Sequence, residues 1–200
     1  NLAIGQLALG TSAVTGAHNV ALGKNAGTAM TSGGENVFLG VDSGKCTTTS
    51  SSSVYLGNSA GKCMQTSAHN VALGGSALMG SSTPGNNTGG CNIVFGKESG
   101  GVLTSGSKNV LIGCKAGNAL TTGTHNIALG SMALGSGAVT GNYNNMFGKD
   151  AGQAITSGHR NNAVGHGALQ YLEEGLCNVA MGAQAGYKID NGDNNITFGA

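Results

Sequence analysis

The sequence is built on a repeat of about seventeen residues, and this period leaves the chain very few possible folds. Units begin at residues 1, 19, 36, 53, 70, 92, 109, 126, 144, 161, 178 and 195, so eleven full units are followed by a short twelfth. Helical repeats that contain two helices need about 33 residues or more. The unit is too short for a helix pair, and it predicts one coil of a parallel β-solenoid.

Each unit opens with the alternation that is typical of a β-strand. The second place is held by residues such as Val20 and Val37, and the fourth by residues such as Leu22 and Leu39. Because side chains alternate along a strand, we expect the second and fourth places to point into the coil. The twelfth place is mostly apolar and is expected to fill the core from a second strand. The eighth place is Ala or Ser in every full unit, as expected where opposite walls of a narrow coil approach each other.

Glycine marks two corners of each coil. The fifth place is glycine in all twelve units, and the fifteenth place is often glycine. Glycine adopts positive φ without steric cost, so both places are predicted to be turns of that kind. The fifth-place glycines predicted as structural residues include Gly23, Gly40, Gly57 and Gly113.

Asparagine holds the first place in eleven of the twelve units, with Ser53 the exception. Stacked asparagines can form a ladder in which each side-chain amide bonds to the next one along the stack. The simpler alternative is that asparagine only tolerates the geometry of the corner. The predicted ladder comprises Asn19, Asn36, Asn70, Asn92, Asn109, Asn126, Asn144, Asn161 and Asn178.

The third place is apolar or aromatic in eleven of the twelve units. If the second and fourth places face the core, alternation puts the third place on the outside. A continuous apolar stripe along a rod indicates an interaction surface. Cyclic association is the closed arrangement open to identical chains, so we expect an oligomer, most simply a trimer. The predicted interface comprises Ala21, Phe38, Tyr55, Val94, Leu111 and Met146.

The N-V-A-L-G-x-x-A openings resemble the head repeats of trimeric autotransporter adhesins. The longer pattern of residues 116–126, A-G-N-A-L-T-T-G-T-H-N, resembles repeats in bacteriophage tail fibres and in fibres of large viruses. The resemblance covers the whole chain and implies a trimeric, left-handed β-roll or triangular β-helix. The period of seventeen is longer than in the adhesin heads and favours the viral fibres. Asn145 and Asn162 depart from the apolar second place.

Composition argues against several classes of partner. The net charge is +1, charged residues make up 8% of the chain, and no basic run is present. Nucleic acid and anionic membranes attract strongly basic chains, so we expect neither partner. No apolar stretch approaches the ~20 residues that cross a bilayer. We therefore expect no membrane insertion.

No arrangement of residues predicts catalysis, a metal or a cofactor, so we expect that the chain is not an enzyme. Residues 40–46 and 57–63 resemble a phosphate-binding loop, but both have one residue too few between the glycines and end in cysteine. His18, His69 and His125 share one column, three coils apart, and are too far from one another to share a metal. A hydrolytic site needs two carboxylates at ~5 to 9.5 Å. The chain offers no such pair, although a site between chains stays open.

Two further features leave alternatives open. Cys46 and Cys63 occupy the eleventh place of neighbouring coils, at a spacing that permits either a disulfide or two stacked thiols. The one long unit carries an insertion at residues 81–90, with a glycosylation sequence at Asn86, and Asn195 begins another. The insertion is either a contact point or a tolerated loop.

Taken together, residues 1–200 are predicted to form a single solenoid domain that is a section of a longer fibre. We expect a structural shaft or head segment of a trimeric fibre at the cell exterior or virion surface, used for attachment, with any receptor or glycan bound through regions outside this section. A bacterial surface adhesin is the first alternative. A monomeric ice-binding solenoid is a weaker one, suggested by the row of Thr and Ser beside one corner and interrupted at Glu173 and Asp190.

Overall fold

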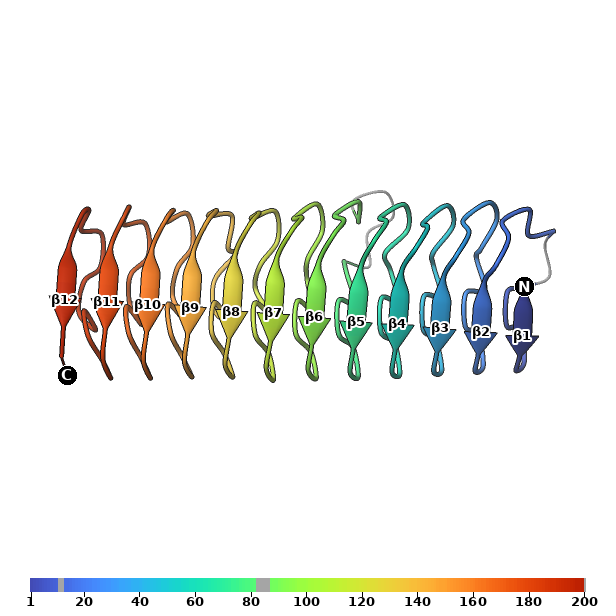
Figure 1. The fold of residues 1–200 in the computed structure, drawn as a ribbon, viewed down its shortest axis with the longest axis horizontal. Coiled ribbons are helices and arrows are strands. Elements are labelled where there is room, and N and C mark those ends of the chain that lie inside the picture. The colour runs from blue at the N-terminus through green and yellow to red at the C-terminus, as the bar shows by residue number, and fades with distance from the viewer. Residues whose placement is uncertain (11–12, 82–86, 200) are drawn as a thin grey trace.

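The chain forms a rod in which every coil contributes one short strand to a single sheet (Figure 1). The computed structural model describes residues 1–10, 13–81 and 87–199. Within these residues all regular structure is β. The strands are β1 (Leu2–Ile4), β2 (Val20–Leu22), β3 (Val37–Leu39), β4 (Val54–Leu56), β5 (Val71–Leu73), β6 (Ile93–Phe95), β7 (Val110–Ile112), β8 (Ile127–Leu129), β9 (Asn145–Phe147), β10 (Asn162–Val164), β11 (Val179–Met181) and β12 (Ile196–Phe198).

The twelve strands are parallel and follow one another in chain order across the sheet. Each strand pairs with the same places of the next unit, as in the partners Val37 and Val54 or Phe38 and Tyr55. Parallel pairing needs a long return of the chain, and the rest of each unit supplies it. The predicted parallel solenoid of about seventeen residues per coil is confirmed.

The expected second strand does not form in the part of the chain that the structure describes. After the fifth place the backbone makes a series of turns in which the seventh and ninth places are left-handed, for example Asp42 at φ 58° and Gly44 at φ 56°. Left-handed residues cannot continue an extended strand. Successive coils are nevertheless bonded along this wall, because the amide of Gly27 donates to the carbonyl of Ser43 at 2.9 Å, and equivalent bonds recur.

The two glycine corners have different causes. The fifth-place glycines have φ between 128° and 139° from Gly23 to Gly182, as predicted. The fifteenth-place glycines, such as Gly106, lie outside the left-handed region, so the conformational reason given for them is wrong. There the backbones of successive coils approach closely: a Cβ on Gly106 would lie 2.5 Å from the carbonyl oxygen of Gly123 in the next coil.

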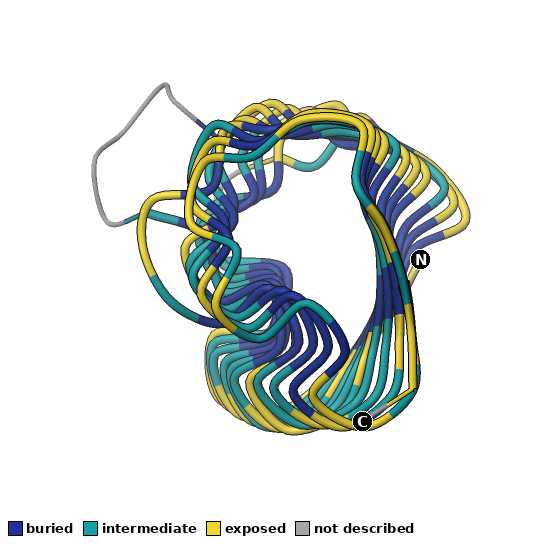
Figure 2. Ribbon diagram, turned by 90° about the vertical axis from the view of Figure 1, so that its left-hand side faces the viewer, coloured by how far each residue is buried: buried dark blue, intermediate teal, exposed yellow. Residues whose placement is uncertain are grey.

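The core is lined by the first, third, eighth and twelfth places of the units. Figure 2 shows that buried residues recur at matching positions of successive coils around the ring. The third-place residues from Ala21 to Ala180 are fully buried, and Met30, Met64 and Leu103 of the twelfth place are also buried. The expectation for the eighth and twelfth places is confirmed. The predicted direction of the second, third and fourth places is wrong, because the first-place asparagines point inward and therefore take the third place with them.

Side chains on the two walls of the core complement one another in size. Gly44 has no side chain where the ring of Phe38 passes, and a Cβ there would lie 2.7 Å from a ring carbon. In other coils the strand carries alanine and the ninth place carries leucine, as with Ala72 and Leu78. The coil therefore keeps a similar filled cross-section along the rod.

Candidate functional site

The sheet presents an apolar surface to solvent along the described rod, which we call the outer sheet face. It consists of the second and fourth places of the units, and 22 of its 24 residues are apolar. Its side chains are partly or fully exposed, with Leu56 at 40%, Ile112 at 38% and Val164 at 43%. The outer sheet face comprises residues 2, 20, 37, 54, 71, 93, 110, 127, 145, 162, 179 and 196 together with residues 4, 22, 39, 56, 73, 95, 112, 129, 147, 164, 181 and 198.

The predicted oligomer interface is corrected by this geometry. Ala21, Phe38, Tyr55, Val94, Leu111 and Met146 are all fully buried inside their own chain. Side chains without exposed surface cannot contact a second copy. The chain does carry an apolar stripe, but it is formed by the neighbouring places. The asparagine column held the necessary signal, because a buried ladder places the third residue of each unit in the core.

The outer sheet face is polar at one location. Asn145 in β9 and Asn162 in β10 hold the second place there, and the Asn145 Nδ2 donates to the Asn162 Oδ1 at 2.8 Å. The two departures from the apolar pattern lie at the surface, so they do not disturb the packing of the core.

The predicted asparagine ladder is present. The Nδ2 of Asn109 donates to the Oδ1 of Asn92 at 3.0 Å and to the carbonyl of Gly123 at 3.0 Å, and the Asn109 amide N–H also donates to the Asn92 Oδ1. Equivalent bonds recur from Asn19 to Asn195, and the side-chain ladder is interrupted at two points. Ser53 replaces asparagine at one of them, and at the other only the backbone N–H of Asn144 donates to the Asn126 Oδ1. Buried amides are stable only when they are bonded, and the ladder satisfies them.

The residues that precede the ladder form a second column, which we call the pre-ladder column. Its members have left-handed backbones, with φ 62° at His18, 60° at Lys108 and 58° at Arg160. The column lies at the surface, where His18 and Lys108 are exposed and His125 is half-buried. No group of three or more His, Cys, Asp or Glu side chains comes together as a metal site within the described residues.

The two loop-like segments at residues 40–46 and 57–63 are corners of the solenoid, and an ion pair joins them. Asp42 accepts a hydrogen bond from the Asn25 Nδ2 at 2.8 Å and lies 3.3 Å from the Lys62 Nζ and 3.5 Å from the Lys45 Nζ. The Asn25 bond, together with the two lysines, holds the pKa of Asp42 below its ordinary value. The lysines therefore neutralise a carboxylate of the rod.

All five cysteines are free thiols in this structure. Burial raises the pKa of the Cys63 thiol, and the neighbouring Cys46 raises it further. A raised pKa lowers the fraction of reactive thiolate, so the Cys63 thiol is not activated as a nucleophile.

The described base of the insertion is held by one side chain. Asn87 is buried, and its Nδ2 donates to the carbonyl oxygens of Cys63 at 2.8 Å and Ser81 at 2.6 Å. Residues 82–86, including the glycosylation sequence at Asn86, lie outside the described residues. The amide of Asn195 takes part in the ladder, where it donates to the Asn178 Oδ1 at 2.9 Å.

The row of threonines beside the second corner is bonded within the rod. The hydroxyls of Thr31, Thr104 and Thr156 each donate to a backbone carbonyl of the next coil, at 3.1, 3.1 and 3.2 Å. An ice-binding face would present such hydroxyls outward. The second members of the row, such as Ser32 and Thr122, are exposed, so the ice-binding alternative stays an untested prediction.

Comparison with known proteins adds no relative. No protein-family model matches the chain, and neither the curated proteins nor the solved structures give a significant match. In the described part of the chain, no helix is long and apolar enough to cross a membrane. The functional interpretation therefore depends on the surfaces of the rod.

Proposed function

We propose that the chain is a structural shaft or head segment of a homotrimeric extracellular fibre that attaches to a host or surface. The observation that carries this proposal is the outer sheet face, which is apolar over almost all of its length. Apolar patches on soluble monomers rarely exceed a few hundred Å², and larger ones usually mark association surfaces.

The size of the outer sheet face fits association. Twelve strands at ~4.8 Å spacing and three residues at ~3.3 Å each give a face on the order of 500 Å², before counting the relief of the side chains. A standard interface takes about 800 Å² from each partner. The face is of the same order, and it would extend with every added coil.

A further copy of this chain is the partner that suits the outer sheet face. The face repeats with the period of the coils, and an identical chain presents the same spacing and the same alternation of Val and Leu. Symmetric association of identical chains closes without leaving an apolar face uncovered. The number three, the placement at the cell exterior or virion surface and the role in attachment rest on the resemblance to viral tail fibres, with a trimeric bacterial adhesin as the alternative source.

Light scattering coupled to size-exclusion chromatography tests the association. The wild-type chain is expected to elute at micromolar concentration with three times the 19.5 kDa chain mass. A monodisperse monomer would overturn the proposal.

Variants locate the interface. Ile112→Asp and Val164→Asp place a charge on the outer sheet face, and we expect both to give folded monomers because an unpaired charge in each copy of an apolar interface is strongly unfavourable. Val102→Asp is the matched control, because Val102 is also apolar and 42% exposed but lies off the sheet. It should assemble normally, and equal assembly of all three variants would contradict an interface at this face.

A further inference from the structure

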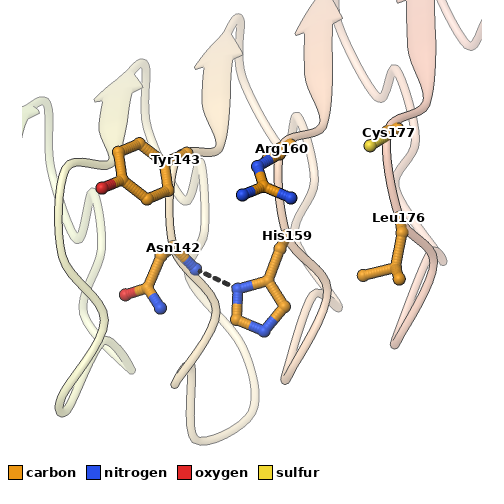
Figure 3. Close-up of a pocket in the computed structure, with 6 residues that line it drawn as sticks. All are labelled: Asn142, Tyr143, His159, Arg160, Leu176 and Cys177. Atoms are coloured by element: carbon orange, nitrogen blue, oxygen red, sulfur yellow. Dashed lines mark hydrogen bonds between the residues drawn. The ribbon is translucent and has the colours of Figure 1, made fainter.

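The surface of the rod is hollowed beside β9 and β10 (Figure 3). This groove has a volume of about 320 Å³ and is lined by the residues that precede three successive ladder asparagines. Its lining comprises Asn142, Tyr143, His159, Arg160, Leu176 and Cys177. We call it the Arg160 groove.

A second hollow, of about 370 Å³, adjoins the Arg160 groove and shares Tyr143 and Arg160 with it. Its third lining residue is Asn162, which belongs to the outer sheet face. The hollowed surface thus reaches the one location where the outer sheet face is polar. The hollow and the change from apolar to amide side chains on the outer sheet face therefore lie at the same location.

Arg160 gives the groove an uncompensated positive charge. Its side chain is exposed, no acidic residue lines either hollow, and the described residues form no ion pair with it. Five lysines of the rod do have acidic partners, such as Lys62 with Asp42, whereas Lys24, Lys108 and Lys188 form no ion pair among the described residues. Arg160 differs from these three lysines because it lines a hollow. A guanidinium presents two parallel N–H groups that match a carboxylate.

Tyr143 supplies an apolar surface next to this charge. Tyr143 is 49% exposed, and its ring packs nearly parallel to that of His125, with ring centroids 4.8 Å apart and an interplanar angle of 15°. Figure 3 shows the ring beside the Arg160 guanidinium of the following coil. A ring held in this way offers a flat apolar surface and a hydroxyl at low entropic cost.

Polar groups of fixed orientation lie beside Arg160 and Tyr143. The Nδ1 of His159 accepts a hydrogen bond from the backbone N–H of Asn142 at 2.9 Å, so the neutral ring carries its proton on Nε2 and can donate there. The Asn162 Oδ1 accepts a hydrogen bond from the Asn145 side chain. The Asn162 side-chain Nδ2 has no acceptor among the described residues. Donors of this kind suit the hydroxyl groups of a sugar.

We propose that the Arg160 groove and the adjoining hollow bind a carboxylated sugar, such as a sialic acid or a hexuronic acid. The carboxylate pairs with the Arg160 guanidinium, the C–H face of the pyranose packs on Tyr143, and the hydroxyls meet His159 and Asn162. This site lies within the rod, and its binding can be measured whether or not the chain associates.

A hollow at the same places of the first coils provides an internal comparison. It is lined by Ala17, His18, Gly34, Glu35 and Ser51, with volume about 300 Å³. Glu35 stands in the pre-ladder column where the later groove has Arg160, and it has the opposite charge. The Glu35 carboxylate opposes a bound carboxylate, and His18 stands where the later groove has Tyr143, so only the Arg160 groove is expected to bind.

Titration calorimetry, with ligand-observed NMR for weak binding, tests the proposal. The probes are 3′-sialyllactose and trigalacturonic acid, and their neutral counterparts are lactose and the methyl ester of trigalacturonate. At least one acid is expected to bind, at one site per chain, and which one binds distinguishes the two sources of the carboxylate. Equal binding of the acids and their neutral counterparts would overturn the proposal. So would the absence of binding by either acid at a ligand concentration of about 10 mM, which is about the weakest affinity that a multivalent fibre could use.

Variants separate the roles of the two central residues. Arg160→Gln should weaken acid binding about tenfold or more, because a charge-assisted pair is lost. Lys108→Gln removes a cation from the same column at a nearly identical φ and should bind like the wild type. Tyr143→Asn should also weaken binding, and Asn194 shows that asparagine adopts this backbone, with φ 57°. Unchanged affinity of Arg160→Gln would exclude the site.

Discussion

In the coil that carries β4 the strand supplies the bulk of the core, whereas in the next coil, which carries β5, the opposite wall supplies it. The β4 coil pairs Tyr55 with Gly61, and the β5 coil pairs Ala72 with Leu78. All four places face inward, and Tyr55, Ala72 and Leu78 are fully buried. A Cβ on Gly61 would overlap the Tyr55 ring. The two coils thus fill one cross-section with the large side chain on opposite sides.

The same exchange occurs along the rod. Ala128 and Ala163 accompany leucine at the ninth place, as Leu134 and Leu169, while Leu111 accompanies Gly117. Where alanine and glycine occur together, a neighbouring coil fills the space: a Cβ on Gly186 would lie 2.7 Å from a methyl carbon of Leu169. The repeat therefore tolerates different residues because the filled volume, and not the residue at any one place, is what the coil requires.

Gly61→Leu should have the largest effect on this complementarity. It adds a leucine to a space that the Tyr55 ring already occupies, and it gives a branched residue a backbone with φ 58°. Overpacking and the left-handed backbone together should lower the free energy of unfolding by about 4 kcal/mol. Urea unfolding followed by circular dichroism measures the loss, and an unchanged midpoint would show that the ring of Tyr55 moves aside freely.

Leu78→Ala should have the next largest effect, because it empties the coil that lacks a large strand residue. Truncation of a buried leucine costs about 3 kcal/mol through lost burial and the remaining cavity. Leu176→Ala is the matched control, since Leu176 is 41% exposed and should change stability by less than about 0.5 kcal/mol. Equal midpoints for the two variants would contradict the assignment of Leu78 to the core.

The double variant Tyr55→Ala, Gly61→Leu should have a smaller effect than either change alone. It gives the β4 coil the residues of the β5 coil, whose Leu78 already tolerates φ 49°. Tyr55→Ala alone should cost about 4 kcal/mol, and the double variant should recover all but about 1 to 2 kcal/mol. A double-mutant cycle with additive losses would mean that the two walls do not share one space.

Much of this packing follows from the sequence, but the direction of the strand does not follow from hydrophobicity alone. The period, the ladder and the small eighth place predict the stacking of coils correctly. The third place is expected at the surface because the second and fourth places, held by residues such as Val37 and Leu39, fit a core-facing strand, and alternation then puts the third place outside. A narrow coil has little room for large residues on both walls, so the inward third place is alanine in each coil whose ninth place carries leucine.

The Arg160 groove could not be predicted from a single unit of the repeat. Its lining comes from three successive coils, at two places of the unit whose residues vary from coil to coil. The signal that was available is the coincidence of Tyr143 and Arg160 in the pre-ladder column with Asn145 and Asn162 in the second place. Only the stacking of the coils shows that these departures share one surface.

Tyr55→Phe should have the smallest effect at neutral pH. Phe38 holds the equivalent place in the preceding coil and stacks on Tyr55, with ring centroids 5.5 Å apart. The Tyr55 hydroxyl is buried without a hydrogen-bond partner, although Ser50, Ser53 and Ser67 lie around it. Removal of this hydroxyl should therefore leave stability unchanged or raise it by about 1 kcal/mol.

The difference between Tyr55→Phe and the wild type should grow at high pH. Burial raises the pKa of Tyr55 in the folded chain above the ordinary value of 10.0. Above pH 10 the phenol of the unfolded chain ionises while that of the folded chain does not, so the wild type loses about 1.4 kcal/mol for each further pH unit until the folded pKa is reached. The variant lacks this loss, and both proteins share the ionisation of the other three tyrosines. Urea unfolding at pH 8, 10 and 11 measures the difference, and parallel curves for the two proteins would show that the Tyr55 hydroxyl is accessible to solvent.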